Sequence, residues 1–133
     1  AGSIQLTFFD IFSDKTKQFG FKAVFPSGKV LACLGDEPFN EKCRNFVQNC
    51  DYLMCEAFCL YSQKDIFKPY EKFHSTALDA GKLAESLFAK NLILYHTEDE
   101  TLQTRKRTYT SEARTVFNGN IFVPDDFEVI NLK

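Results

Sequence analysis

The sequence predicts a single α/β domain built on a mixed sheet. Residues 4–34 alternate between apolar and polar side chains as strands do. Two short apolar runs, 52–57 and 91–95, have the composition of buried strands, and residues 76–88 between them have helical apolar spacing. A strand-rich start followed by strands that alternate with helices indicates a layered structure in which helices pack on a sheet.

The N-terminal quarter is predicted to be strands. Residues 4–11 place Ile4, Leu6 and Phe8 on one face of an extended segment. Residues 20–34 are predicted to form a hairpin, because the tetrapeptide Pro-Ser-Gly-Lys in their middle supplies turn chemistry. Its proline presets one backbone angle and its glycine tolerates positive φ.

A short helix is expected over 40–48. Asn40 can cap its first turn, and Cys43, Phe46 and Val47 are expected to face inward.

The clearest helix signal lies at 76–88. Thr76 and Asp79 have the spacing of a capping box, with Asp in place of the longer Glu. The expected apolar stripe consists of Leu78, Leu83, Ala84 and Leu87. The other expected elements are irregular structure at 58–73, helical segments at 102–109 and 111–117, and short strands at 121–123 and 128–130.

Composition excludes several classes of protein. With 133 residues, of which 44% are hydrophobic, the chain can bury one core and is not typical of a disordered protein. The net charge of -2 gives no overall attraction to nucleic acid. The local basic run 105–107 is either a nucleic-acid contact or a solvated helical face.

Cysteine usage and the ends of the chain bear on the compartment. The five cysteines contain no Cys-x-x-Cys pair, and no second pair or nearby His completes a zinc knuckle with Cys55 and Cys59. Free thiols in the cytoplasm are expected, because no signal peptide or membrane-crossing apolar run is present. Residues 1–3 have the composition of a tag remnant or cut site, which leaves 4–133 as the domain.

Polar groups stand where predicted strands end, and α/β folds place their chemistry there. Asp36 directly follows the strand that ends in Leu34-Gly35, where it could bridge metal ions or simply form a turn. His96 ends the strand 91–95, where its imidazole could be a metal ligand or could bond a backbone carbonyl.

Two further candidates could act as a pair. His74 precedes the helix 76–88, either facing a site where anions are favoured or lying on the surface near the cap. Glu56 stands in an apolar strand and therefore needs a partner. That partner could be His74, which Glu56 would orient for acid or base work, or a Lys or Arg in a plain buried ion pair.

These residues resemble the later motifs of the ribonuclease Z-like metallo-β-lactamase-fold hydrolases. Those motifs are Gly-Asp-Thr, His-Glu-Ala-Thr, His-Ser-Thr and a strand that ends in His. The matching segments are Gly35-Asp36, Cys55-Glu56-Ala57-Phe58, His74-Ser75-Thr76 and Leu92-Ile93-Leu94-Tyr95-His96. Successive candidate residues are 20, 18 and 22 positions apart, as in that family.

The resemblance implies a fold and a mechanism. The chain would be the C-terminal half of an αββα sandwich, with helices on one face of its sheet. Asp36 would be shared by two zinc ions and His96 would be a terminal ligand of one of them. His74, supported by Glu56, would contact the scissile phosphate or protonate the leaving group. A metal-activated water would cleave RNA or another phosphodiester.

The sequence also departs from the family pattern. The family's main ligand cluster, His-x-His-x-Asp-His, has no counterpart here, and Cys55 replaces the His of His-Glu-Ala-Thr. Glu37-Pro38 follows Gly-Asp, and Thr97-Glu98-Asp99 follows His96, where ribonuclease Z has other residues. These departures indicate a side branch of the family.

The missing ligands imply a partner. Catalytic zinc takes three protein ligands, so the chain alone is expected to be inactive. We expect the N-terminal half or a second copy of the chain to complete the site, with a homo-oligomer formed through a bare apolar sheet face and no membrane association. The competing hypothesis is a non-catalytic α/β interaction module. Convergence of Asp36, Glu56, His74 and His96 at one sheet edge would favour the hydrolase.

Overall fold

The computed structural model describes residues 2–133, so Ala1 of the expected tag remnant lies outside it. A six-stranded sheet has the same strand order in space as in the chain. Its strands are β1 (Gln5–Asp10), β2 (Phe19–Val24), β3 (Val30–Cys33), β4 (Tyr52–Glu56), β5 (Asn91–Tyr95) and β6 (Asn120–Phe122). The first three strands pair antiparallel, whereas β3 to β6 pair parallel. The predicted mixed α/β sheet is confirmed.

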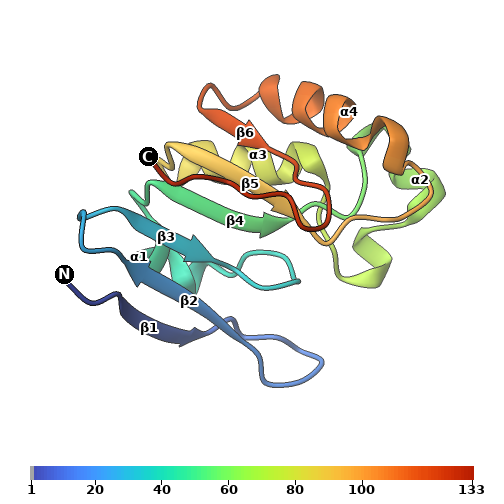
Figure 1. The fold of residues 1–133 in the computed structure, drawn as a ribbon. Helices are drawn as coiled ribbons and strands as arrows, with labels where there is room; N and C mark the ends of the chain where they lie inside the picture. The colour runs from blue at the N-terminus through green and yellow to red at the C-terminus, as the bar shows by residue number, and fades with distance from the viewer. Residues whose placement is uncertain (1) are drawn as a thin grey trace.

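The helices lie in the connections between the parallel strands. They are α1 (Arg44–Val47, preceded by the 3₁₀ turn Glu41–Cys43), α2 (Lys64–Phe67, flanked by the 3₁₀ turns Tyr61–Gln63 and Tyr70–Lys72), α3 (Ala77–Ser86) and α4 (Leu102–Arg114). Figure 1 shows α1 and α3 behind the sheet, with α4 beside β6. Right-handed crossovers that each add a strand on the same side place their helices on one face of the sheet.

Alternation along the strands gives the sheet a covered face and an open face. Buried side chains on the covered face pack in one cluster with Ala84, Tyr109 and Ala113 of the helices. The strand residues in this cluster are Phe9, Ala32, Leu53, Cys55, Leu92 and Leu94. The core therefore lies between the sheet and the helices.

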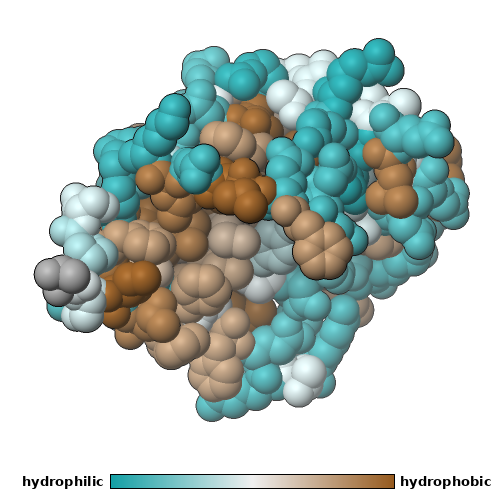
Figure 2. Space-filling model, viewed as in Figure 1, coloured by the Kyte–Doolittle hydropathy of each residue, from teal (hydrophilic) through white to brown (hydrophobic). Residues whose placement is uncertain are grey.

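The open face is apolar over its antiparallel half. Leu6, Phe8, Phe19 and Phe21, which we call the open-face patch, lie on adjacent strands β1 and β2. Leu6, Phe8 and Phe19 are 55%, 65% and 56% exposed. Figure 2 views this side of the sheet and shows a continuous apolar surface in that region. A patch of this kind is typical of a surface that another protein segment covers.

Most local predictions are confirmed. Gly28 has φ 82° in the turn of the β2–β3 hairpin, where Phe25 N donates to Lys29 O at 2.9 Å. The Asn40 side chain accepts from Lys42 N, as a helix N-cap does. Thr76 and Asp79 form the reciprocal capping box at the start of α3.

The stripe of α3 is partly wrong. Leu78 and Leu83 are only half-buried, whereas Ala77, Ala80 and Gly81 face the core. The reason is the close approach of α4, because a Cβ on Gly81 would lie 2.9 Å from Ala113 O. Only small side chains fit where the two helices touch. Similarly, Phe46 is 40% exposed rather than inward, although its ring stacks on Phe9 at 4.9 Å.

The C-terminal third differs in two respects. The expected helical segments 102–109 and 111–117 form one continuous helix, α4. Residues 128–130 are not a strand, because the tail in which they lie crosses the sheet instead of joining it (Figure 1). Its last residue is fixed by Lys133 N, which donates to the Tyr52 hydroxyl oxygen at 2.9 Å. None of the helices in residues 2–133 combines the length and the apolar character that a membrane span requires.

Candidate active site

The four candidate residues meet at the carboxyl edge of the parallel strands. Asp36 lies in the turn after β3, Glu56 is the last residue of β4, and His96 directly follows β5. His74 comes from the loop before α3. Parallel strands end at the same edge of a sheet, so residues 60 positions apart in sequence become neighbours there.

Glu56 is the buried centre of this site. It is 1% exposed, and its Oε2 lies 2.6 Å from His74 Nδ1. Its Oε1 accepts hydrogen bonds from Ser75 N at 2.7 Å and Ser75 Oγ at 3.1 Å. Both carboxylate oxygens are thus engaged by the His74-Ser75 pair. The partner of Glu56 is the imidazole, and the alternative of a buried ion pair with Lys or Arg is wrong.

Burial controls the protonation of this pair. It raises the pKa of Glu56 to about 8, against the opposing effect of the Ser75 hydrogen bonds. Burial also lowers the pKa of His74, and electrostatic repulsion from the neighbouring His96 ring contributes to this. Both shifts disfavour the doubly ionised form of the Glu56–His74 pair. His74 Nε2 is the ring nitrogen left to face other groups.

His96 stands on the outer side of the pair. Its Nδ1 lies 3.6 Å from Glu56 Oε2, and its Nε2 lies 3.9 Å from Asp36 Oδ2. The His74 and His96 rings are 5.0 Å apart, and the His96 side chain is 40% exposed. His96 also has φ 54°, a left-handed conformation that is unusual for a residue with a side chain. Six other non-glycine residues in the described part of the chain share this conformation.

A hydrogen bond ties the turns that carry the two outer groups. The Tyr95 hydroxyl donates to Gly35 O, so the residue before His96 holds the residue before Asp36. Gly35 has φ 78°, which glycine adopts without cost and which lets the chain turn sharply after β3. Burial raises the pKa of Tyr95, so its hydroxyl remains a donor at all ordinary pH values.

Known proteins are similar to this chain in sequence and in fold. Ribonuclease Z from Bacillus cereus (strain AH187) is 32% identical over 98 residues, which cover 74% of this chain and 31% of the relative. The metallo-β-lactamase fold protein YhfI from Bacillus subtilis superposes with a TM-score of 0.73 at 21% identity, over 93% of this chain and 48% of that one. Human tRNase Z, short form, gives 0.71 at 24% identity, over 96% and 43%.

The chain is similar in sequence to ribonuclease Z and has the metallo-β-lactamase fold. The expected recognition and fold class are confirmed. No protein-family model matches the chain. The chain spans about a third of the length of the curated relatives it matches, and less than half of the superposed structures. Only part of the metallo-β-lactamase fold is therefore present in it.

The donor set fits a metal ion. One ligand atom each from Glu56, His74 and His96 lies within 4.8 Å of the other two, and Asp36 stands beside His96. Glu56 is the least available of these, because His74 and Ser75 already occupy its oxygens. Imidazole nitrogens and a carboxylate are ligands that zinc and related divalent metals accept. The side chains that remain available to bind a metal in this ribonuclease Z-like chain are therefore Asp36 and the two imidazoles.

Cys55, which replaces a family His, does not join the metal-binding group. Successive strand residues point to opposite faces, so Cys55 faces the covered side while Glu56 faces the site. Cys55 is 3% exposed, and burial raises its pKa, so the thiol stays protonated and is a poor ligand. All five cysteines are free thiols.

The basic run 105–107 does not form one surface. Arg105 lines a cavity with His96, but its guanidinium is bonded to Thr97 Oγ1 at 2.7 Å and to Asp125 at 3.3 Å. Lys106 pairs with Asp125 and Glu128, and Arg107 lines a different cavity beside Leu60. Only Arg105 lies near the site, so a continuous nucleic-acid contact through these residues is not supported.

Proposed function

We propose that the chain supplies one side of a two-zinc centre that cleaves phosphodiesters, RNA among them, and that it is inactive without the rest of the fold. The observation that carries the proposal is the convergence of two imidazoles and two carboxyl groups at one sheet edge. The family resemblance and the similarity to ribonuclease Z from Bacillus cereus support the reaction class.

The residues divide into two roles. Asp36 and His96 are the metal ligands, because their oxygen and Nε2 atoms lie side by side at the rim and Glu56 is already bonded elsewhere. His74 is the catalytic residue, since Nδ1 is held by Glu56 and Nε2 remains to donate to a phosphoryl oxygen or the leaving group. Glu56 positions His74. Zinc, when bound, supplies an activated water and positive charge for the phosphoryl group.

The partner is the complementary part of the metallo-β-lactamase fold. Asp36 and His96 are too few ligands for two catalytic zinc ions. The superposed structures extend well beyond the part that this chain covers, and the open-face patch leaves Leu6, Phe8 and Phe19 exposed. The tail adds Phe127 and Val129, which are 102% and 80% exposed. We infer that a second sheet docks here and brings the remaining ligands.

We also propose a cellular setting, and the thiols support it. Five free cysteines fit a reducing compartment such as the cytoplasm.

The test is reconstitution. The chain is mixed with a polypeptide that carries the complementary residues of a Bacillus cereus ribonuclease Z, in zinc buffer, and hydrolysis of bis(p-nitrophenyl) phosphate is followed. We expect neither polypeptide to be active alone and the mixture to gain activity that His74→Ala lowers at least about 100-fold. His96→Ala should lower it and also reduce zinc binding. A complex whose activity is indifferent to both substitutions would contradict the proposal.

The second candidate is a non-catalytic interaction module. The open-face patch favours it, because the patch would bind a partner whether or not chemistry occurs. A stable complex in the same experiment, with neither zinc binding nor hydrolysis, would support this alternative.

A further inference from the structure

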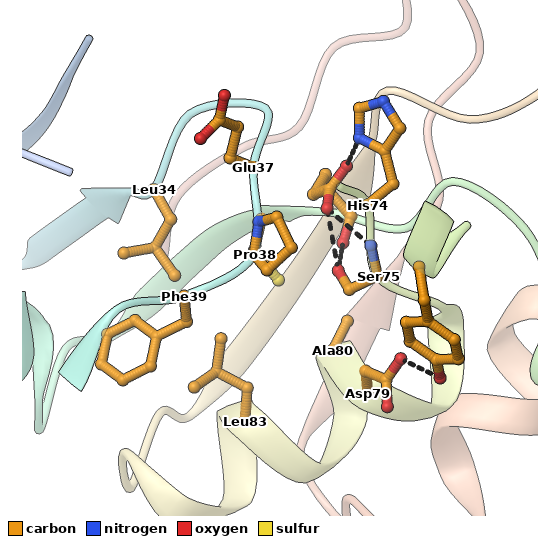
Figure 3. Close-up of a pocket in the computed structure, with 12 residues that line it drawn as sticks. Leu34, Glu37, Pro38, Phe39, His74, Ser75, Asp79, Ala80 and Leu83 are labelled. Carbon is orange, nitrogen blue, oxygen red and sulfur yellow. Dashed lines mark hydrogen bonds and ion pairs between the residues drawn. The ribbon is translucent and has the colours of Figure 1, made fainter. Parts of the chain in front are cut away.

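A second cavity adjoins the proposed site on its helix side. It has a volume of about 260 Å³ and lies between the turn after β3 and the first turns of α3 (Figure 3). Its walls are mostly apolar, from Leu34, Phe39, Ala80 and Leu83. Glu56, His74 and Ser75 form the end that it shares with the proposed site.

We propose that this cavity binds a single neutral heteroaromatic ring that carries an amino group, of the size of one nucleobase. The inference rests on the proposed function, because the ring would belong to the residue joined to the phosphoryl group at His74. The volume is below that of a pocket for a drug-sized ligand, so one ring is the appropriate size.

Charge excludes a phosphate inside the cavity. Its acidic lining residues include Glu37 and Asp79, and within residues 2–133 neither Lys nor Arg lines it. An anion would meet acids and apolar surface only, whereas an uncharged ring would bury apolar area.

The polar groups at the rim are acceptors. Asp79 Oδ2 accepts from the Tyr70 hydroxyl at 2.8 Å and from Thr76 N at 2.9 Å, which fixes the carboxylate. Glu37 differs, because Figure 3 shows its carboxylate directed away from the apolar walls, where Oε1 accepts from Ser13 Oγ at 2.7 Å and Gln18 Nε2 at 3.1 Å. Asp79 Oδ1 has no hydrogen bond within the described residues. An ionised carboxylate accepts and does not donate, so Asp79 selects a ligand that offers N–H groups.

His74 connects the two sites. Its Nδ1 side faces Glu56 and the cavity, whereas its Nε2 is free for a phosphoryl group. Its ring also stacks on Phe58 at 4.9 Å, which fixes the plane of the imidazole. A base in the cavity and a phosphoryl group at Nε2 would therefore lie on opposite sides of the fixed His74 imidazole. One ribose could connect them.

The test uses the ¹⁵N-labelled chain and free nucleosides. Cytidine and adenosine, which carry amino groups, and uridine, which does not, are titrated while amide shifts are recorded. We expect cytidine or adenosine to shift the amides of Phe39, Ala80 and Leu83 with affinity of roughly 1–10 mM, which is reasonable for a ring of this size. Uridine should bind at least about threefold more weakly, because its ring offers a single N–H donor whereas an amino group offers two.

Two variants localise the binding. Leu83→Trp fills the cavity from a half-buried helical position and should weaken cytidine binding more than about tenfold. Leu78→Phe, on the same helix and equally half-buried but outside the lining, should leave binding unchanged. Unshifted cavity amides with every nucleoside, or binding that survives Leu83→Trp, would overturn the inference. Zinc binding at Asp36 and His96, measured separately on the same samples, reports on the proposed function independently.

Discussion

The Tyr95 hydroxyl donates a hydrogen bond to the carbonyl oxygen of Gly35. Each of these residues directly precedes a proposed metal ligand, His96 and Asp36. The bond crosses from the end of β5 to the turn after β3, over the intervening strand β4. It therefore fixes the relative position of the two turns, which the sheet alone leaves free because both lie beyond its last hydrogen bonds.

Removing this bond should loosen the proposed metal ligands. Tyr95→Phe keeps the ring and leaves the Gly35 carbonyl without its donor, which should cost about 1–2 kcal/mol of the free energy of unfolding. Zinc affinity, measured by competition with a chelator, should fall about tenfold, because groups that orient ligands contribute at that level. Tyr61→Phe, at an exposed position away from the site, is the control. Unchanged zinc affinity in Tyr95→Phe would show that the turns are fixed by other contacts.

The backbone conformation of His96 should lower the stability of the chain, while its imidazole contributes to zinc binding. Its φ of 54° suits glycine, so His96→Gly should leave the chain as stable as the parent or stabilise it by up to about 1 kcal/mol. His96→Ala removes the same imidazole but keeps the backbone strain, and should not gain stability. Both variants should lose zinc affinity to the same extent. Urea unfolding and chelator competition measure the two effects, and a loss of stability in His96→Gly would argue against strain at this position.

Glu56 should control the titration of His74. Glu56→Gln keeps the volume and an oxygen acceptor for Ser75, but its amide group can only donate to Nδ1 and no longer balances a protonated ring. The pKa of His74, which burial already lowers, should move lower still. NMR titration of the imidazole measures this shift. In the reconstituted enzyme the same variant should lose activity, and Ser75→Ala, which leaves the Glu56–His74 contact in place, should lose much less. A raised His74 pKa would contradict the positioning role.

The loss of folding stability at acid pH should depend on Asp51. Asp51 is 8% exposed and bonds to Lys90 Nζ and Val30 N, both at 2.8 Å. The Lys90 hydrogen bond is the main cause that holds the pKa of Asp51 below its usual value. A lowered folded-state pKa contributes stability above the unfolded pKa of about 3.9, and this stability is lost as the pH falls through the folded pKa.

Asp51→Asn removes that dependence. At about pH 7 the variant should be about 1–2 kcal/mol less stable in urea unfolding. The difference from the parent should shrink as the pH drops below about 4, where the parent carboxyl protonates. Asp65→Asn, whose parent side chain is 86% exposed, is the matched control and should change little at any pH. A gap that stays constant down to about pH 2 would mean that the charge of Asp51 is not the cause.

The open-face patch should drive self-association when nothing covers it. Phe8→Lys places a charge in the centre of the patch at a side chain that is 65% exposed, so stability should change by about 0.5 kcal/mol or less. Light scattering should show a smaller mean mass for Phe8→Lys than for the parent. Ile66→Lys, equally apolar and 71% exposed but on α2, should behave as the parent does. A parent chain that is already monomeric at high concentration would contradict this prediction.

The sequence by itself determined the elements and their chemistry. The alternation at 4–34, the turn glycine Gly28 and the capping box of Thr76 and Asp79 act within a few residues, so their outcome depends on local sterics and hydrogen bonds. The absence of a polar break in 91–95 likewise marks a buried strand. The candidate residues were identified for the same reason, since a polar group at the end of an apolar strand is visible in the sequence.

Contacts between distant segments decided the rest. Ala80 and Gly81, rather than Leu78, face the core because α4 approaches α3 closely, and 128–130 is no strand because the tail crosses the sheet instead of pairing with it. Whether Glu56 pairs with His74 or with a cation was open from the sequence, and only the fold brings Oε2 and Nδ1 to 2.6 Å. Burial then shifts both pKa values, since desolvation depends on what surrounds a group and not on its neighbours in the chain.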